Sequence, residues 1–152
     1  MTRIQVGNAA PDFHILGHDG NELALSDYRG KQVVVLFFYP RNDTAVCTAE
    51  ACGFRDAYED FVAAGAALLG VTTASAAAQH AFASKHDLQY HLLADEHGSL
   101  RKAYGVSATL GIIPGRVTYV IDKQGIVRHI FCAQFAAQRH VDEALKVVRS
   151  LA

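Results

Sequence analysis

The chain has 152 residues, of which 51% are hydrophobic and 19% are charged, and its formal net charge is −1. This length predicts one domain, residues 1–152, whose core is large enough to fold without disulfides. The balanced charge argues against a nucleic-acid or membrane-surface partner, and no apolar run reaches the roughly 20 residues of a membrane span.

The N-terminus and the cysteine count bear on the compartment. The first residues, MTRIQVGNAAPDF, contain no hydrophobic signal core. The chain has three cysteines, an odd and low number that argues against the disulfide framework of a secreted protein. We therefore expect a cytoplasmic protein, with a processed organellar form as the alternative. In either, closely spaced cysteines are expected to serve redox or metal chemistry.

The first part of the chain predicts a hairpin, a buried strand and a helix. Residues 13–31 contain two short alternating runs around the turn residues 18–21, which is a hairpin pattern. Residues 32–39, QVVVLFFY, form a β-branched and aromatic run, typical of a strand buried on both faces. Asp43 or Thr44 can cap a helix that begins near Ala45. Apolar residues then follow helical spacing until Gly65, namely Val46, Phe54, Ala57, Tyr58, Phe61 and Val62.

The rest of the chain alternates strands with helices and contains a second hairpin. The predicted ranges are strands 66–73 and 90–95, helices 75–87 and 99–106, a hairpin over 116–135 and an amphipathic helix over 139–152. This alternation predicts an α/β fold with a central mixed sheet flanked by helices. Together with the N-terminal hairpin, the element order is that of a thioredoxin-like fold.

Cys47 lies in the first turn of the helix predicted after the buried strand. With Thr44 as the N-cap, its sulfur lies near unpaired backbone N–H groups and the positive end of the helix dipole. This environment favours the thiolate form of a cysteine. Pro40 fixes the backbone where the chain leaves the strand, and the Thr44 hydroxyl can donate to an oxygen substrate. The alternatives are a buried structural cysteine and a threonine that only caps the helix.

The segment YPRNDTAVCTAEACGFRD resembles the active-site segment of peroxiredoxins, Pro-x-x-x-Thr/Ser-x-x-Cys. Pro40, Thr44 and Cys47 match this pattern in order and spacing. The continuation CTAEACGFRD resembles the peroxiredoxin Q branch, also called bacterioferritin comigratory protein. Further segments that resemble the family in the right order are residues 8–40, 92–106 and 116–127.

The resemblance implies a thioredoxin-like fold and thiol peroxidase activity without a metal or an organic cofactor. It assigns to Arg116 a role in stabilising the thiolate and binding the peroxide oxygens, and to Glu50 a role in orienting Arg116. The alternatives are a surface arginine and a solvated helix residue. The implied partners are a peroxide substrate and thioredoxin or a similar dithiol reductant.

In this branch the resolving cysteine often lies five residues after the reactive one, a position that Cys52 occupies here. Five helical residues place the Cα atoms about 8–9 Å apart, whereas a disulfide generally needs less than about 7 Å. We therefore predict that the first helical turns unwind in each cycle. Gly53 is consistent with this, because a glycine inside a helix costs roughly 1 kcal/mol relative to alanine. Cys132 is predicted to be a buried structural residue, with a rival resolving role as the alternative.

The chain departs from the family pattern at three places. Ala45-Val46 stands where the branch has Pro-Gly, so the helix start is expected to be stiffer or shifted. The segment 105–116 is short for the branch, which predicts a different rim of the substrate pocket. The C-terminus lacks the Val-Cys-Pro of dimer-crosslinking peroxiredoxins, so we expect a monomer or a weak dimer.

Three other functions fit parts of the pattern. A thioredoxin-like disulfide oxidoreductase would need CxxC and a cis-proline, but the spacing here is CxxxxC and Pro114 is followed by Gly-Arg. A non-catalytic peroxide sensor would use the same reactive thiol, so this alternative stays open. A zinc site would need ligand spacing, and no histidine lies within five residues of Cys47 or Cys52.

Overall fold

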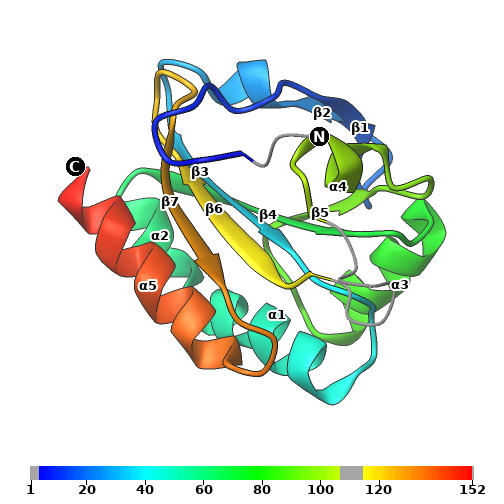
Figure 1. Ribbon diagram of the computed structural model, residues 1–152. Coiled ribbons are helices and arrows are strands. Elements are labelled where there is room, and N and C mark those ends of the chain that lie inside the picture. Colours follow the sequence, from blue (N-terminus) through cyan, green and yellow to red (C-terminus); the bar gives the residue numbers. More distant parts are fainter. Residues whose placement is uncertain (1–3, 107–114, 152) are drawn as a thin grey trace.

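The computed structural model describes residues 4–106 and 115–151 (Figure 1). The elements in chain order are β1 (His14–Leu16), β2 (Glu22–Ala24), the 3-10 helix η1 (Leu25–Tyr28), β3 (Val33–Phe38), α1 (Ala45–Asp56), α2 (Tyr58–Ala63), β4 (Ala66–Thr72), α3 (Ala76–Lys85), β5 (His91–Ala94), α4 (Ser99–Ala103), β6 (Val117–Ile121), β7 (Val127–Cys132) and α5 (Ala137–Ser150). Each of the three predicted single strands is present within one residue of its predicted bounds. Both predicted hairpins are present but shorter: the first ends at Ala24, just before η1, rather than at residue 31, and the second ends at Cys132 rather than at residue 135.

The central sheet has five strands in the order β5-β4-β3-β6-β7. β3, β4 and β5 run parallel to one another, whereas β6 is antiparallel to β3 and β7 is antiparallel to β6. β1 and β2 form a separate antiparallel pair. The predicted fold class is therefore confirmed, including the mixed sheet and the N-terminal hairpin.

β3 lies in the middle of the sheet and divides the core into two layers, because alternate side chains of a strand point to opposite faces. Its odd-numbered residues pack with side chains of α1, α2, α3 and α5. Its even-numbered residues pack on the other face with side chains of η1, α4 and the N-terminal segment. All six residues of β3 are buried, as predicted for a strand covered on both faces. Figure 1 shows α1, α2 and α5 side by side over one face.

The prediction of a single helix after β3 is wrong, because the structure has two helices, α1 and α2, separated by Ala57. Glu59 and Asp60 lie in the first turn of α2, where negative side chains stabilise a helix N-terminus. Apolar spacing does not contain this signal. Val62, which the spacing placed on the apolar face, is 48% exposed.

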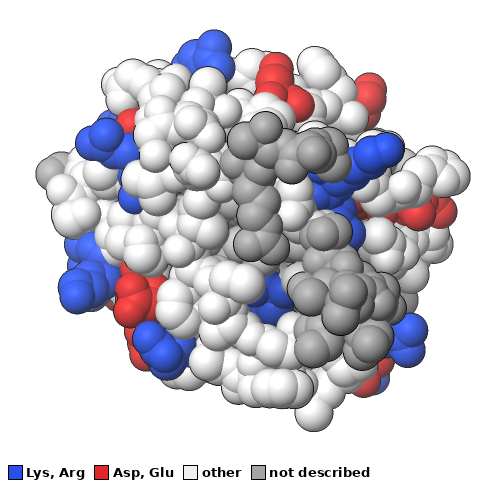
Figure 2. Space-filling view, in the orientation of Figure 1, with Lys and Arg blue, Asp and Glu red and all other residues white. Residues whose placement is uncertain are grey.

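Helix composition and surface charge bear on the predicted partners. Among the described residues, no helix is both long and apolar enough to cross a membrane. On the face in Figure 2, charged side chains of both signs are scattered over the described part of the chain, without a large field of one sign.

Pro114 and most of the segment 105–116 lie outside the described residues.

Candidate active site

The loop between β3 and α1 is tied to neighbouring elements. The Thr72 hydroxyl, at the end of β4, donates to the Pro40 carbonyl (3.1 Å). The Tyr39 hydroxyl donates to Asn42 Oδ1 (2.8 Å), and Asn42 Nδ2 donates to Gln79 Oε1 of α3 (2.9 Å). These bonds hold the loop against β4 and α3, so the first turn of α1 begins from a fixed position.

Thr44 is the N-cap residue of α1, as predicted, although its side chain makes no capping bond in the described structure. Its hydroxyl donates instead to the Arg41 carbonyl (3.3 Å). Asp43, the alternative cap, has a φ of 64°, a conformation that asparagine and aspartate adopt more readily than other non-glycine residues. Its carboxylate pairs with Lys85 (3.2 Å). With no side-chain cap, the first N–H groups of α1 can stabilise an anion.

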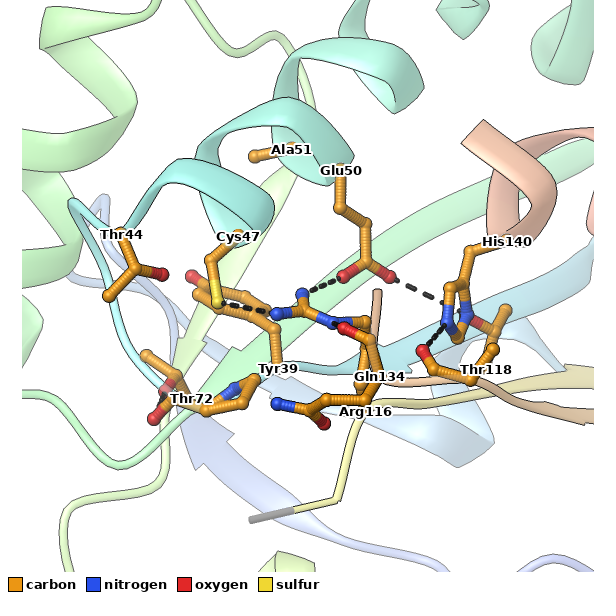
Figure 3. A network of polar contacts seen from close by, with 12 residues as sticks. Tyr39, Thr44, Cys47, Glu50, Ala51, Thr72, Arg116, Thr118, Gln134 and His140 are labelled. Carbon is orange, nitrogen blue, oxygen red and sulfur yellow. Dashed lines mark hydrogen bonds and ion pairs between the residues drawn. The ribbon is translucent and has the colours of Figure 1, made fainter. Parts of the chain in front are cut away.

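Cys47, Arg116 and Glu50 form one buried chain of polar contacts (Figure 3). Arg116 Nη2 donates to Cys47 Sγ (3.1 Å), and Arg116 Nη1 donates to Glu50 Oε1 (2.6 Å). Cys47 and Glu50 are three residues apart on α1, a spacing that places both on one face of a helix. Arg116 is 3% exposed and Glu50 is 0% exposed. The alternatives of a surface arginine and a solvated glutamate are therefore wrong.

The position of Arg116 follows from the sheet. Arg116 directly precedes β6, and the β3–β6 register pairs Phe38 with Val117, so the arginine lies beside the end of β3. Its Nε donates to the Gln134 carbonyl in the loop after β7 (2.8 Å). All three guanidinium nitrogens thus have a partner, which fixes the plane of the group.

Glu50 lies behind Arg116 with its two oxygens in different surroundings. Oε1 accepts the bond from Arg116, whereas Oε2 has no hydrogen-bond partner among the described residues. Burial raises the pKa of Glu50 to about 7, although the charge and hydrogen bond of Arg116 lower it. The carboxyl group is therefore poised to gain or lose a proton near neutral pH.

His140 of α5 completes the network and was not predicted from the sequence. Its Nδ1 lies 3.7 Å from Glu50 Oε2 and 2.8 Å from Thr118 Oγ1, and its Nε2 lies 2.7 Å from the Ala133 carbonyl. Burial lowers the pKa of His140. One signal could have indicated it: His140 lies four residues before the buried Ala144, so it falls on the apolar face of the closing helix.

Cys52 lies on the same helix but outside this network. Cys47 is buried and Cys52 is half-buried, and both are free thiols. α1 is continuous from Ala45 to Asp56, and a continuous helix keeps their Cα atoms about 8–9 Å apart. Because that distance exceeds the reach of a disulfide, the two thiols are not a preformed pair.

Gly53 has a packing function that the sequence did not indicate. A Cβ atom at this position would lie 3.1 Å from Val141 Cγ2 and 3.4 Å from Gln138 Oε1 of α5. The missing side chain therefore lets α1 and α5 approach closely. Its predicted role in weakening the helix stays a prediction.

A cavity of about 470 Å³ opens beside Cys47 and Arg116. Its other lining residues are Pro40, Arg41, Thr44, Ala45, Val46, Gln134 and Phe135. Phe135 stands at the rim and is 82% exposed. Four of the predicted site residues thus line one cavity, and Ala45-Val46, the first two residues of α1, form part of its wall. The predicted effect of Ala45-Val46 on the helix start, relative to the family, stays a prediction.

Cys132, predicted to be buried, is exposed at the end of β7. This prediction is wrong because β7 is an edge strand, so only one side of it pairs with the sheet.

Within residues 4–106 and 115–151, no group of three or more histidine, cysteine, aspartate or glutamate residues could hold a metal ion.

Comparisons with known proteins identify relatives of this site and fold. Residues 6–130 match the AhpC/TSA family. A Populus jackii protein named peroxiredoxin Q, chloroplastic, is 45% identical over 152 residues, which are 99% of this chain and 71% of the relative. Because this relative is named chloroplastic, the expected cytoplasmic location has no support from it.

Two solved structures resemble the whole chain. Peroxidoxin BcpB from Mycobacterium tuberculosis superposes with a TM-score of 0.91 at 33% identity, over 99% of each chain. Thioredoxin peroxidase I from Plasmodium yoelii superposes with a TM-score of 0.85 at 29% identity, over 97% of this chain and 90% of the other.

Proposed function

Since this chain belongs to the AhpC/TSA family, in its peroxiredoxin Q branch, and is a thiol peroxidase, we propose that Cys47 is the residue that attacks the peroxide. The observation that carries the proposal is the 3.1 Å hydrogen bond from Arg116 Nη2 to the buried Cys47 sulfur. A guanidinium group at this distance stabilises the thiolate, which is the nucleophilic form of cysteine.

In the first step, the Cys47 thiolate attacks one peroxide oxygen in line with the O–O bond. The S–O bond forms as the O–O bond breaks, and the leaving hydroxide or alkoxide takes up a proton to give water or an alcohol. Arg116 and the first N–H groups of α1 stabilise the developing negative charge. The Thr44 hydroxyl, which lines the cavity, joins them when it turns from the Arg41 carbonyl. Cys47 becomes a sulfenic acid.

The cavity suits hydrogen peroxide and organic hydroperoxides. Its polar end is formed by Cys47 and Arg116, and its wall contains Pro40, Val46 and Phe135. The polar end takes the peroxide group that both substrates share. The apolar wall takes the hydrocarbon part of an organic hydroperoxide, because its burial removes apolar surface from water.

In the second step, the Cys52 thiol condenses with the Cys47 sulfenic acid, so that an S–S bond forms and water leaves. The first turns of α1 unwind to bring the two sulfurs together. Thioredoxin or a similar dithiol then reduces the disulfide, as the name of the Plasmodium relative supports. In this proposal the protein is an atypical two-cysteine peroxiredoxin, acting as one domain over residues 1–152 and as a monomer or weak dimer.

The test of these roles is a thioredoxin-coupled peroxidase assay on the wild type and on single cysteine variants. We expect Cys47→Ser to abolish turnover, because the nucleophile is lost. Cys52→Ser keeps the first oxidation but recycles slowly and over-oxidises at Cys47, which mass spectrometry detects. Cys132→Ser is the matched control and is expected to keep wild-type turnover.

Several outcomes would contradict the proposal. Turnover by Cys47→Ser would remove Cys47 from the reaction, and normal turnover by Cys52→Ser would remove Cys52. A disulfide between positions 47 and 132 in peroxide-treated protein would assign resolution to Cys132. Absence of peroxide consumption by the wild type would indicate a non-catalytic peroxide sensor. Sedimentation analysis tests the predicted oligomeric state.

A further inference from the structure

Glu50 and His140 form a buried pair for which the peroxidase steps supply no role beyond the orientation of Arg116. Both side chains are 0% exposed, and Glu50 Oε2 lies 3.7 Å from His140 Nδ1. Oε2 has no hydrogen-bond partner in the described part of the chain. A buried carboxylate oxygen without a donor is costly, so the protonation state of this pair determines whether its burial is tolerable.

The contacts of His140 identify which of its nitrogens faces Glu50. A carbonyl oxygen can only accept, so Nε2 carries hydrogen and donates to the Ala133 carbonyl (2.7 Å). In the neutral imidazole, Nδ1 then carries no hydrogen, and its lone pair accepts a hydrogen bond from the Thr118 hydroxyl (2.8 Å). Glu50 Oε2 therefore faces a nitrogen that has no hydrogen to donate unless the pair binds one more proton.

The positively charged Arg116 contacts both groups that can become anions, the Cys47 thiol and the Glu50 carboxyl. Figure 3 shows it between Cys47 and Glu50, with His140 on the far side of Glu50. A thiolate on Nη2 and a carboxylate on Nη1 would place two anions on one guanidinium group. In a buried site, where like charges repel strongly, the two ionisations oppose each other.

Two tyrosines and Arg139 also act on the pair. Tyr39, at the end of β3, and Tyr90, just before β5, lie within the field of Glu50. Burial raises the pKa of both tyrosines, so both stay neutral. Arg139 lies beside His140 on α5 and stacks over the Phe131 ring, 5.0 Å from its centroid. Its charge contributes to the lowered pKa of His140, after burial.

We propose that Glu50 and His140 hold one proton between them while Cys47 is a thiolate, so that the charge of Arg116 is left to the sulfur. The proton resides on Glu50 Oε2 or on His140 Nδ1, and in either case the pair carries no net charge. The two residues are positioning residues, because they act on Cys47 through Arg116. This inference rests on the proposed role of Cys47 and deepens it.

The pair and the thiol then titrate as coupled groups. When the pair loses its proton, the Glu50 carboxylate competes for Arg116 and the Cys47 thiolate becomes less stable. The pKa of Glu50, which burial raises to about 7, agrees with a pair that keeps its proton up to neutral pH. The reactivity of Cys47 should therefore rise with pH in two steps rather than one.

The test measures the rate of Cys47 alkylation by iodoacetamide against pH, without peroxide, in the Cys52→Ser/Cys132→Ser background. Glu50→Gln imitates the protonated carboxyl and should lower the pH midpoint of thiolate formation by about one unit, as removal of a neighbouring charge does. His140→Gln removes one site for the proton and offers an N–H to the carboxylate, so it should raise the midpoint. In the double variant, the effect of His140→Gln should vanish.

Glu143→Gln is the matched control, because Glu143 lies on α5 beside a different histidine, His129 (3.4 Å), and should leave the midpoint unchanged. An unchanged or raised midpoint in Glu50→Gln would overturn the inference and leave Glu50 with orientation alone. The inference would also be overturned if His140→Gln shifted the pH midpoint of thiolate formation equally in the wild type and in the Glu50→Gln variant.

Two features keep this test independent of other failures. If a variant does not fold, the alkylation rate of the wild-type Cys47 against pH still tests the inference, since a single step in that profile would contradict a coupled pair. If the proposed function is wrong, turnover fails in the coupled assay while the alkylation profiles are unaffected.

Discussion

The two cysteines of α1 lie in opposite surroundings, although fewer than two helical turns separate them. Cys47 is buried, and its sulfur contacts Arg116, which the sheet and the Gln134 carbonyl hold in place. Cys52 is half-buried, on a part of the helix that contacts α5 and the segments just after α3 and just before β5. Arg116 contacts the Cys47 sulfur itself, whereas the contacts near Cys52 are made to other residues of α1.

The contacts near Cys52 come from three neighbouring elements. The Tyr90 hydroxyl donates to the Ala51 carbonyl (2.7 Å), and Arg55 Nη1 donates to the His86 carbonyl (2.8 Å). Gly53 packs against α5. In the proposed cycle, groups that need not move prepare Cys47 to react, whereas unwinding of α1 as far as Cys52 would break the contacts around it.

The largest effect is expected from removing the charge that distinguishes the Cys47 region. Arg116→Met should lower kcat/KM by about 10²–10³-fold, the usual effect of losing one donor to a developing anion. It should also destabilise the fold by about 1–3 kcal/mol, because the buried Oε1 of Glu50 loses its hydrogen-bond donor. The coupled assay and urea unfolding measure the two effects.

The double variant Arg116→Met/Glu50→Gln separates the two effects. It should recover most of the stability, because the carboxyl group that lost its donor is removed as well, but none of the activity. Recovery of activity as well would mean that Arg116 only neutralises Glu50, and the contrast between the two halves of α1 would lose its chemical basis.

A smaller effect is expected from loosening the Cys52 region. Tyr90→Phe removes one hydrogen bond to the α1 backbone, which contributes about 1 kcal/mol. If unwinding breaks this bond, the disulfide between positions 47 and 52 should form several-fold faster after one equivalent of peroxide. Rapid quenching followed by mass spectrometry measures that rate.

Tyr104→Phe is the control for this prediction. It removes a bond of the same length, from the Tyr104 hydroxyl to the Pro11 carbonyl (2.7 Å), on the other face of the sheet. It should lower stability by a similar amount without changing the rate. Equal rates in both variants would show that unwinding stops before Ala51.

The smallest net effect is expected at Gly53, where two contributions oppose each other. Gly53→Ala gains about 1 kcal/mol of helix propensity but crowds Val141, and such overpacking costs about 1–3 kcal/mol. Because Val141 is 1% exposed and has little room to shift, we expect a net loss of about 1 kcal/mol in urea unfolding. In a Val141→Ala background the sign should reverse. Stabilisation in the otherwise wild-type protein would show that Gly53 serves to weaken the helix rather than to admit α5.

Local patterns predicted the parts of the molecule that depend on neighbours in the chain. The run over 32–39 predicted β3 because an unbroken apolar strand must be covered on both faces. Ser75 predicted the start of α3, and its side chain does accept from the Ala78 N–H (3.1 Å). The break at Ala57 was missed because apolar spacing continues through it while the acidic residues that start α2 carry a different signal.

Contacts between distant segments were predicted only where a motif linked them. Arg116 was placed beside Cys47 by resemblance, not by periodicity, since 69 residues separate them. No motif linked His140 to Glu50 or Val141 to Gly53, and both contacts depend on α5 lying across α1. The exposure of Cys132 likewise depends on β7 being the last strand of the sheet.

The sequence by itself determined the α/β class, the helix start that carries Cys47, and the five-residue separation of Cys52, because periodicity, capping and helix geometry are properties of adjacent residues. Tertiary structure alone decided how deeply Arg116 and Glu50 are buried, and that His140 lies beyond them. The reason is electrostatic: the effect of one buried charge on another depends on distance and burial, and only the packed sheet and helices establish either.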